Sequence, residues 1–280
     1  MEVFTSISEL KRFLRLHRAQ DQSVGLVPTM GALHAGHISL LQSSTNENDI
    51  SVCSIFVNPV QFTNPQDLEK YPRTFENDCR MLEDAGCSAV FAPSVDEMYE
   101  ETPLMKLNFG VLETVMEGAS RPGHFNGVGI VVSRFFNIVQ PDRAYFGQKD
   151  LQQVAVVKRL VKDLAFQLEL RVCPTVRETD GLAMSSRNSR LNSQERDAAP
   201  FIYQMLSEAK ANLEKGIEVS EVVDLVQKHF LSNSKFQLDY FEIANADSLQ
   251  PLDTIGGAGS NAICIAAFLG PVRLIDNIIF

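Results

Sequence analysis

Apolar side chains near the start of the chain recur every three or four positions, at Ile7, Leu10, Phe13 and Leu14. This spacing places them on one face of a helix. Ser6 precedes the apolar positions and Glu9 follows three residues later, which is the pattern of a capping box. The sequence therefore predicts a capped first helix that ends near Ala19.

Short apolar runs farther along the chain have the length and β-branched content of buried strands. They cover residues 24–27, 50–57, 88–93, 144–147 and 167–174. The first run is expected to end at Pro28, because proline cannot donate to a strand ladder. Helices are predicted between the runs: one begins near Ala35 or Gly36, one ends at Gly86, and one covers 151–164. The alternation predicts a doubly wound parallel sheet up to about residue 175.

The pattern changes after that point. Two amphipathic stretches over about 193–214 and 218–231 are followed by strand-like runs over 236–243, 261–269 and 272–280. Helices followed by several strands are typical of a small α+β unit. We therefore expect a nucleotide-binding domain over 1–175 and a smaller α+β domain over 176–280 that covers the site.

Composition narrows the class of protein. The chain has 280 residues and a formal net charge of −10, so extended contact with a nucleic-acid backbone is disfavoured. Five cysteines without a C-x-x-C spacing argue against a disulfide framework or a cysteine zinc site. No apolar signal core begins the chain, and no apolar run approaches the ~20 residues that span a bilayer. These features predict a cytoplasmic protein that acts on neither membranes nor nucleic acids.

Three loops with chemically informative residues each follow a predicted strand, at 28–37, 58–62 and 147–150. Parallel sheets bind ligands at the carboxyl ends of their strands. In the first loop, His34 and His37 are three residues apart and share a helix face. The helix start offers unpaired N–H groups to a phosphate. Packed histidines remain an equally good interpretation of this pair, whereas a metal site lacks further ligands at zinc spacing.

The other candidate residues each have a plain structural alternative. Asn58 and Gln61 can hold a substrate, or belong to an ordinary Asn-Pro turn. Arg121 and His124 lie in a glycine-rich segment that approaches an anion or simply turns the chain. Lys149 can neutralise phosphate.

Two further candidates follow the same logic. Asp150 binds a ribose hydroxyl or caps the helix that follows it. Ser185, Ser186 and Arg187 form a polyphosphate clamp or an exposed polar loop.

Taken together and in order, these segments resemble the pantoate–β-alanine ligase family (pantothenate synthetases) over essentially the whole chain. The segments are "PTMGALHAGH", "NPVQF", "YPR", "RPGHFNGV", "FGQKD", "VRETDGLAMSSRN" and "RLIDN". The family in turn resembles the HxGH nucleotidyltransferases, whose signature stands here as His34-Ala35-Gly36-His37 on a Rossmann-like sheet. Departures are small: Gln148 and Gln66 replace a glutamate that the family often has.

The resemblance implies a two-step reaction with ATP as co-substrate and Mg²⁺ carried by ATP. Pantoate is first adenylated with release of pyrophosphate, and the amine of β-alanine then displaces AMP. The resemblance also implies a homodimer. It names His37 as a general acid, although we expect mainly electrostatic stabilisation from it.

The resemblance further implies a set of contacts. Gln61, Gln153, Asn58, Arg121 and His124 are expected around pantoate and β-alanine, and His34, His37, Lys149, Ser185, Ser186 and Arg187 are the expected catalytic group. The nucleotide is expected to meet Met30, Gly31, Ala32, Leu33, His34, Ala35, Gly36, His37, Gly147, Gln148, Lys149, Asp150, Val176, Met184, Ser185, Ser186 and Arg187. A nucleotidyltransferase and a nucleotide sensor without turnover are the alternatives.

Overall fold

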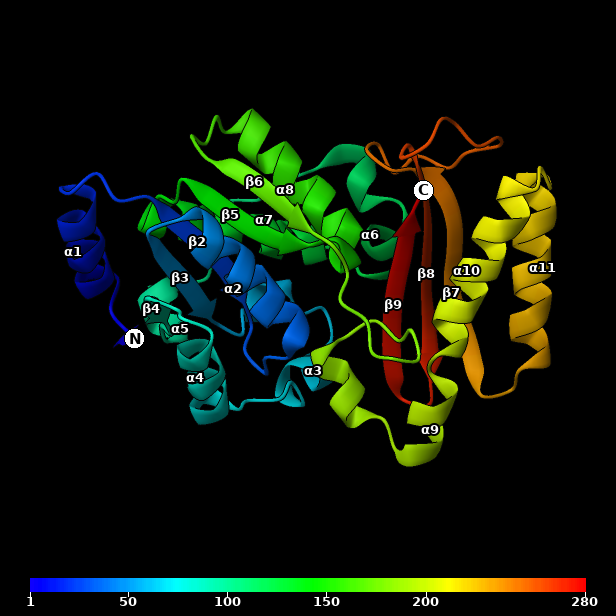
Figure 1. The fold of residues 1–280 in the computed structure, drawn as a ribbon, viewed down its shortest axis with the longest axis horizontal. Helices are drawn as coiled ribbons and strands as arrows, with labels where there is room; N and C mark the ends of the chain where they lie inside the picture. Colours follow the sequence, from blue (N-terminus) through cyan, green and yellow to red (C-terminus); the bar gives the residue numbers. More distant parts are fainter.

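A parallel six-stranded sheet forms the centre of the molecule in the computed structural model, which describes residues 1–280 (Figure 1). Its strands are β1 (Glu2–Phe4), β2 (Val24–Thr29), β3 (Ile50–Ile55), β4 (Ala89–Phe91), β5 (Arg143–Gly147) and β6 (Glu169–Cys173). Their order across the sheet is β1-β4-β3-β2-β5-β6. The structure confirms the predicted Rossmann-like, doubly wound sheet.

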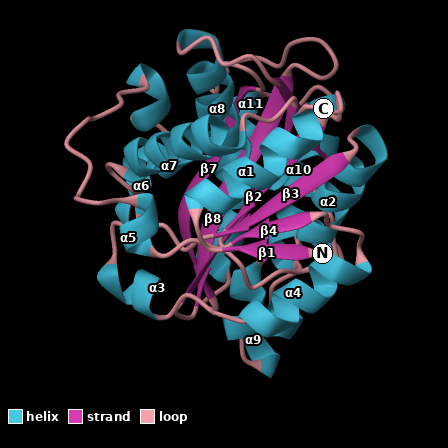
Figure 2. Cartoon of the chain, turned by 90° about the vertical axis from the view of Figure 1, so that its left-hand side faces the viewer, coloured by secondary structure: helices cyan, strands magenta, loops and turns pink.

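Helices cover both faces of this sheet. The cluster on one face joins apolar residues of α1 (Ile7–Arg18), α7 (His124–Val139) and α8 (Leu151–Asp163) to the strands. The cluster on the other face joins α2 (Ala35–Glu47) and α4 (Phe75–Asp84) to them. Figure 2 shows the strands between α7 on one side and α2 and α4 on the other. Since both faces are covered, the inner strands β2, β3 and β4 are largely apolar and buried, as the sequence indicated, whereas the edge strand β6 carries the charged Glu169 and Arg171.

The strand order brings the three informative loops to one place. β2 lies between β3 and β5, so the chain turns to one side after β2 and returns to its other side at β5. This is the topological switch point at which doubly wound sheets bind ligands. The loops at 28–37, 58–62 and 147–150 therefore start from neighbouring strands.

A three-stranded antiparallel sheet follows, with order β7-β8-β9. It consists of β7 (Phe236–Asn245), β8 (Asn261–Leu269) and β9 (Val272–Ile279), and α10 (Phe201–Glu214) and α11 (Val219–Ser232) pack on one face of it. β9 is the strand nearest the larger part (Figure 1). The structure confirms the smaller α+β unit, and the boundary at 175/176 stays a prediction.

Short elements complete the chain. They are η1 (Pro59–Gln61), α3 (Pro65–Glu69), α5 (Val95–Met98), η2 (Gly110–Glu113), α6 (Met116–Ser120), η3 (Gln148–Asp150), η4 (Ser186–Arg190) and α9 (Ser193–Ala198). None of the helices is both long enough and apolar enough to cross a bilayer.

Three local predictions were wrong, each for a physical reason. β2 continues through Pro28 to Thr29, because its pairing with β5 reaches only Leu26 and no strand on that side needs the N–H that Pro28 lacks. Ser6 stands at the start of α1 but makes no cap, since its hydroxyl bonds Ser8 instead. The helix expected over 193–214 is broken near Pro200 into α9 and α10.

Candidate active site

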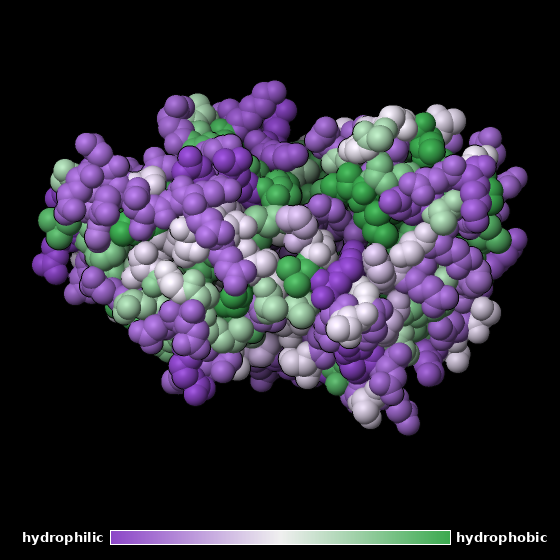
Figure 3. Space-filling model, viewed as in Figure 1, coloured by the Kyte–Doolittle hydropathy of each residue, from purple (hydrophilic) through white to green (hydrophobic).

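A cleft of about 570 Å³ lies between the two parts of the molecule. Its walls come from the carboxyl ends of β2, β3 and β5 on one side and from the face of the small sheet opposite α10 and α11 on the other. The space-filling view shows a notch between the two parts, where hydrophilic and hydrophobic side chains lie next to each other (Figure 3). Such a mixed concave surface is the usual form of a small-molecule site.

All but five of the residues expected around the substrates line this cleft. Those on its wall are Met30, His34, Gly36, His37, Asn58, Gln61, Arg121, His124, Gly147, Lys149, Asp150, Gln153, Val176, Met184, Ser185, Ser186 and Arg187. The structure does not bring Gly31, Ala32, Leu33, Ala35 or Gln148 to the wall.

The two histidines of the HxGH segment cap the helix that they begin. The Nδ1 atom of His34 accepts a hydrogen bond from the Gly36 N–H (3.1 Å), and the Nδ1 atom of His37 accepts one from the His34 N–H (3.3 Å). The unpaired N–H groups that the sequence led us to expect are therefore partly satisfied by the histidines themselves. Because each Nδ1 is an acceptor, each neutral ring carries its proton on Nε2.

Burial and charge keep both rings neutral. Burial lowers the pKa of His34 to about 4, and the Lys149 ammonium adds to this effect. Burial lowers the pKa of His37 to about 3, with further contributions from His34 and Lys149. The ring centroids are 4.0 Å apart. The pair thus offers two neutral N–H donors at neutral pH.

The backbone between β2 and α2 is held from outside. The buried Asp78 carboxylate accepts hydrogen bonds from the N–H groups of Ala32 and Leu33, both at 2.9 Å. The Ser186 hydroxyl donates to the Ala32 carbonyl (2.9 Å). The loop over 184–187 therefore lies against the turn that precedes the HxGH segment.

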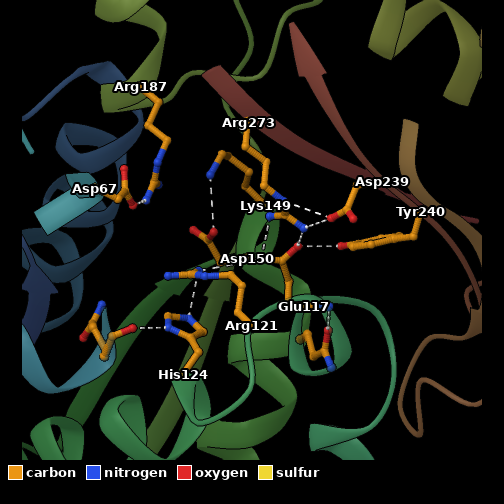
Figure 4. A network of polar contacts seen from close by, with 12 residues as sticks. Asp67, Glu117, Arg121, His124, Lys149, Asp150, Arg187, Asp239, Tyr240 and Arg273 are labelled. Carbon is orange, nitrogen blue, oxygen red and sulfur yellow. Dashed lines mark hydrogen bonds and ion pairs between the residues drawn. The ribbon is translucent and has the colours of Figure 1, made fainter. Parts of the chain in front are cut away.

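The cations of the 149 and 187–190 segments along the cleft are each paired with a carboxylate, as Figure 4 shows for Lys149 and Arg187. Lys149 Nζ is 3.3 Å from the carboxylate of Asp150. Asp67 accepts from Arg187 (2.9 Å) and from Arg190 (3.0 Å). Although burial opposes it, Arg187 and Arg190 hold the pKa of Asp67 below its usual range. Asp150 does not cap α8, so the simple capping interpretation was wrong.

Gln61 also lines the cleft. Its Oε1 atom accepts from Asn58 Nδ2 (3.1 Å) and its Nε2 atom contacts the Met30 sulfur (3.1 Å). Asn58 is buried and also bonds Val60, Tyr99 and Gly127, so its amide is fully used within the protein.

His124 is likewise occupied. Its Nδ1 atom lies 2.8 Å from the Gln61 carbonyl and its Nε2 atom lies 3.2 Å from the Arg121 guanidinium. Burial and the adjacent Arg121 lower the pKa of His124 to about 4. The neutral ring therefore donates to Gln61 and accepts from Arg121, which leaves neither nitrogen free.

A buried carboxylate joins the two parts of the molecule beside Arg121. Glu117 accepts from both terminal nitrogens of Arg273 (2.9 and 2.7 Å) and from the Tyr240 hydroxyl (2.9 Å), as Figure 4 shows. Asp239 accepts from Arg273 as well (2.6 Å). α6 is thereby tied to β7 and β9.

Sequence reasoning missed several of these residues. Asp67 lies shortly after the "NPVQF" segment, but its two arginine partners are 120 and 123 residues away, so the sequence offered no signal for the pairing. Asp78 and the Glu117–Arg273 pair gave none, because the contacts that matter join residues far apart in the chain: Asp78 reaches its two N–H donors across 46 and 45 positions, and Glu117 reaches Arg273 across 156. No group of three or more His, Cys, Asp or Glu side chains gathers to hold a metal ion.

Comparison with known proteins places this architecture in context. The family model described as "Pantoate-beta-alanine ligase" matches residues 2–279. A protein named pantothenate synthetase from Bacteroides thetaiotaomicron is 49% identical over 278 residues, 99% of this chain and 98% of that protein. Another of that name from Caldicellulosiruptor bescii is 45% identical over 280 residues, 100% of this chain and 99% of that protein.

Two solved structures of proteins with these names resemble the fold of this chain. The pantothenate synthetase of Thermus thermophilus has a TM-score of 0.93 at 42% identity and covers 99% of both chains. A pantoate–β-alanine ligase from Francisella tularensis, complexed with β-γ ATP and β-alanine, has a TM-score of 0.84 at 35% identity and covers 100% of this chain and 97% of that one.

The three neutral histidines make stability depend on pH. His34, His37 and His124 have folded-state pKa values below the ordinary 6.5, so the unfolded chain binds more protons below that pH. Their stabilisation is complete above about pH 6.5 and falls as the pH is lowered toward 4, by up to about 1.4 kcal/mol per pH unit for each group. We expect the free energy of unfolding in urea to fall between pH 7 and pH 5.

A variant of His124 tests whether the histidines cause this dependence of the free energy of unfolding on pH. His124→Asn keeps a donor toward the Gln61 carbonyl but cannot titrate, and we expect it to reduce the slope. A free energy of unfolding that stays constant or rises toward pH 5, or a slope unchanged in the variant, would contradict the assignment.

Proposed function

The chain belongs to the pantoate–β-alanine ligase family, and we infer from this that it joins pantoate to β-alanine at the expense of ATP. In the first step, a pantoate carboxylate oxygen attacks the α-phosphorus of ATP, and the bond to pyrophosphate breaks. In the second, the amine of β-alanine attacks the carbonyl carbon of pantoyl adenylate, loses a proton and displaces AMP. The product is pantothenate, the coenzyme A precursor.

The observation that carries our assignment of roles is the neutral histidine pair at the start of α2. Two Nε2–H donors fixed by helix capping are aligned before the substrate arrives. Donors that need no reorientation stabilise the charge that develops on phosphate oxygens in the transition state. We assign His34 and His37 to the phosphates of ATP.

The size of the pKa shift of His37 disfavours a proton transfer from this residue. A close opposite charge moves a pKa by about 1 to 3, and the pKa of His37 starts at about 3. Bound triphosphate would therefore still leave the ring neutral near pH 7. The role of His37 is hydrogen bonding rather than general acid catalysis.

The paired cations act by exchanging partners. Lys149 and Arg187 are held by Asp150 and Asp67 before ATP binds, and the phosphates take the place of these carboxylates. Ser185 and Ser186 add hydroxyl donors on the same loop. Mg²⁺ enters with ATP, bound to its phosphates and to water, as is usual for this ion.

Pantoate binds beside this phosphate site. The Gln61 amide, held by Asn58 and Met30, and Gln153 on α8 provide neutral donors and acceptors. Asn58 and His124 position Gln61 rather than contact substrate, because their polar atoms are used within the protein. Arg121 is the cation nearest to them and suits a substrate carboxylate.

Closure of the smaller unit over the cleft would protect pantoyl adenylate from water. The ion pair between Glu117 on α6 and Arg273 on β9 fixes the position of the small sheet relative to α6. The homodimer and the cytoplasmic location stay predictions.

The reaction has a direct test in ATP–pyrophosphate exchange. We expect exchange that requires pantoate and proceeds without β-alanine, because adenylation alone is reversible. Exchange independent of pantoate would instead indicate a nucleotidyltransferase, and ATP binding without exchange would indicate a sensor.

Replacement of His37 tests the phosphate site. His37→Ala removes one transition-state donor, and we expect kcat for exchange to fall on the order of 10²–10³. His229→Ala is the matched control, since His229 is exposed on α11 outside the cleft. Thermal melts would verify that the variant is folded at the assay temperature, because the cap on α2 is also lost. An unchanged kcat with chemistry rate-limiting would refute the role.

Replacement of Gln61 tests the pantoate site. Gln61→Ala removes a ground-state contact, so the pantoate KM should rise while kcat changes less. Substrate titrations of the exchange reaction would measure both constants. If the ATP KM rose more than the pantoate KM, Gln61 would have been assigned to the wrong substrate.

A further inference from the structure

The last strand of the small sheet reaches across the cleft to the loop that carries Lys149. Asn277, on β9, is only 3% exposed. Its Nδ2 atom donates to the carbonyl oxygens of Gln148 (3.0 Å) and Lys149 (2.8 Å). One side-chain amide thus uses both of its hydrogens on two consecutive peptide groups.

These peptide groups belong to a tight turn with no side-chain cap of its own. The 3₁₀ turn η3 joins β5 to α8 directly, and Gly147 before it has no side chain to offer. The Asp150 side chain is paired with Lys149 rather than with the backbone. A buried side chain from the other part of the molecule therefore fixes the turn.

Asp276, the residue before Asn277 on β9, helps to hold the loop that carries Arg187. Asp276 accepts two hydrogen bonds from Arg177 (2.6 and 3.0 Å). Arg177 pairs with Ala183, at the start of the loop that continues to Arg187. Two consecutive residues of one strand, 276 and 277, thereby hold both loops that carry the cations assigned to ATP.

We propose that Asn277 is a positioning residue for adenylation, which orients Lys149 through the backbone of η3. The inference rests on the proposed role of Lys149 at the phosphates. Asn277 acts on the protein and not on substrate, since both hydrogens of its amide nitrogen are engaged and its Oδ1 atom accepts from Gln148 Nε2 (3.5 Å). A displacement of about 1 Å in a charge-stabilising group costs on the order of 10²-fold in rate.

Asparagine suits this position for a chemical reason. An amide nitrogen presents two donors at an angle that can reach two carbonyls. Aspartate has the same shape but only acceptors, and it would place a negative charge against the two carbonyl oxygens. Serine keeps a single donor on a shorter side chain.

The experiment compares Asn277→Asp, Asn277→Ser and Asn277→Ala in pantoate-dependent ATP–pyrophosphate exchange. We expect kcat to fall about 10- to 100-fold in Asn277→Ala and Asn277→Asp, less in Asn277→Ser, and the pantoate KM to stay within about 3-fold.

Asn261→Ala is the matched control. Asn261 is equally buried on the same sheet and donates to the carbonyls of Gly256, Gly257 and Phe280, away from the cleft. The Asn261→Ala variant should lose about as much thermal stability as Asn277→Ala does, while its kcat for exchange should be retained.

A double-mutant cycle with Lys149→Met separates positioning from general support. If Asn277 acts through Lys149, Asn277→Ala will have little further effect on kcat in the Lys149→Met background. Additive losses, or an equal loss of kcat in Asn261→Ala, would overturn the inference. Unchanged exchange in Lys149→Met itself would instead refute the proposed function of Lys149. If Asn277→Asp fails to fold, Asn277→Ala and Asn277→Ser still complete the cycle.

Discussion

The placement of β2 between β3 and β5 is the constraint on which the site depends. Parallel strands that are neighbours end at the same edge, so segments that start near residues 28, 58 and 147 emerge side by side. Helices on both faces bury the inner strands and keep this edge fixed. A histidine pair, a glutamine and a lysine can then converge on one ligand although the sequence separates them widely.

Irregular backbone at that edge needs hydrogen-bond partners that no regular element supplies. Distant buried side chains provide them. Asp78 binds two N–H groups of the turn before α2, and Asn277 binds two carbonyls of η3. The His34 and His37 rings complete the set by capping their own helix. The substrate-facing groups are thus held by a layer of polar residues that point into the protein.

The sequence predicted the features that depend on local pattern. Apolar runs identified the main strands, and the loops after them identified the candidate site. The sequence-based prediction was wrong or silent where a residue distant in the chain decides the outcome. β2 continues past Pro28 because its pairing with β5 ends at Leu26. Glu117 contacts Arg273 because the two parts of the molecule pack together. The three-residue strand β1 is too short to give a periodic signal. Capping by the histidines was also beyond reach, since imidazole is not a usual cap.

The pairing of charges explains how a protein of net charge −10 can bind a highly anionic nucleotide. An unpaired cation in a secluded cleft loses hydration without compensation. Asp67, Asp150 and Glu117 remove that cost by occupying the cations before ATP arrives. In the proposed site, ATP would replace one anionic partner by another, and a triphosphate with its several charges would compete well against a single carboxylate. Glu117 differs from the other two because it is buried and also bonds Tyr240. We therefore propose that its pair with Arg273 persists and keeps the two parts of the molecule together, whereas the pairs of Asp67 and Asp150 exchange when ATP binds.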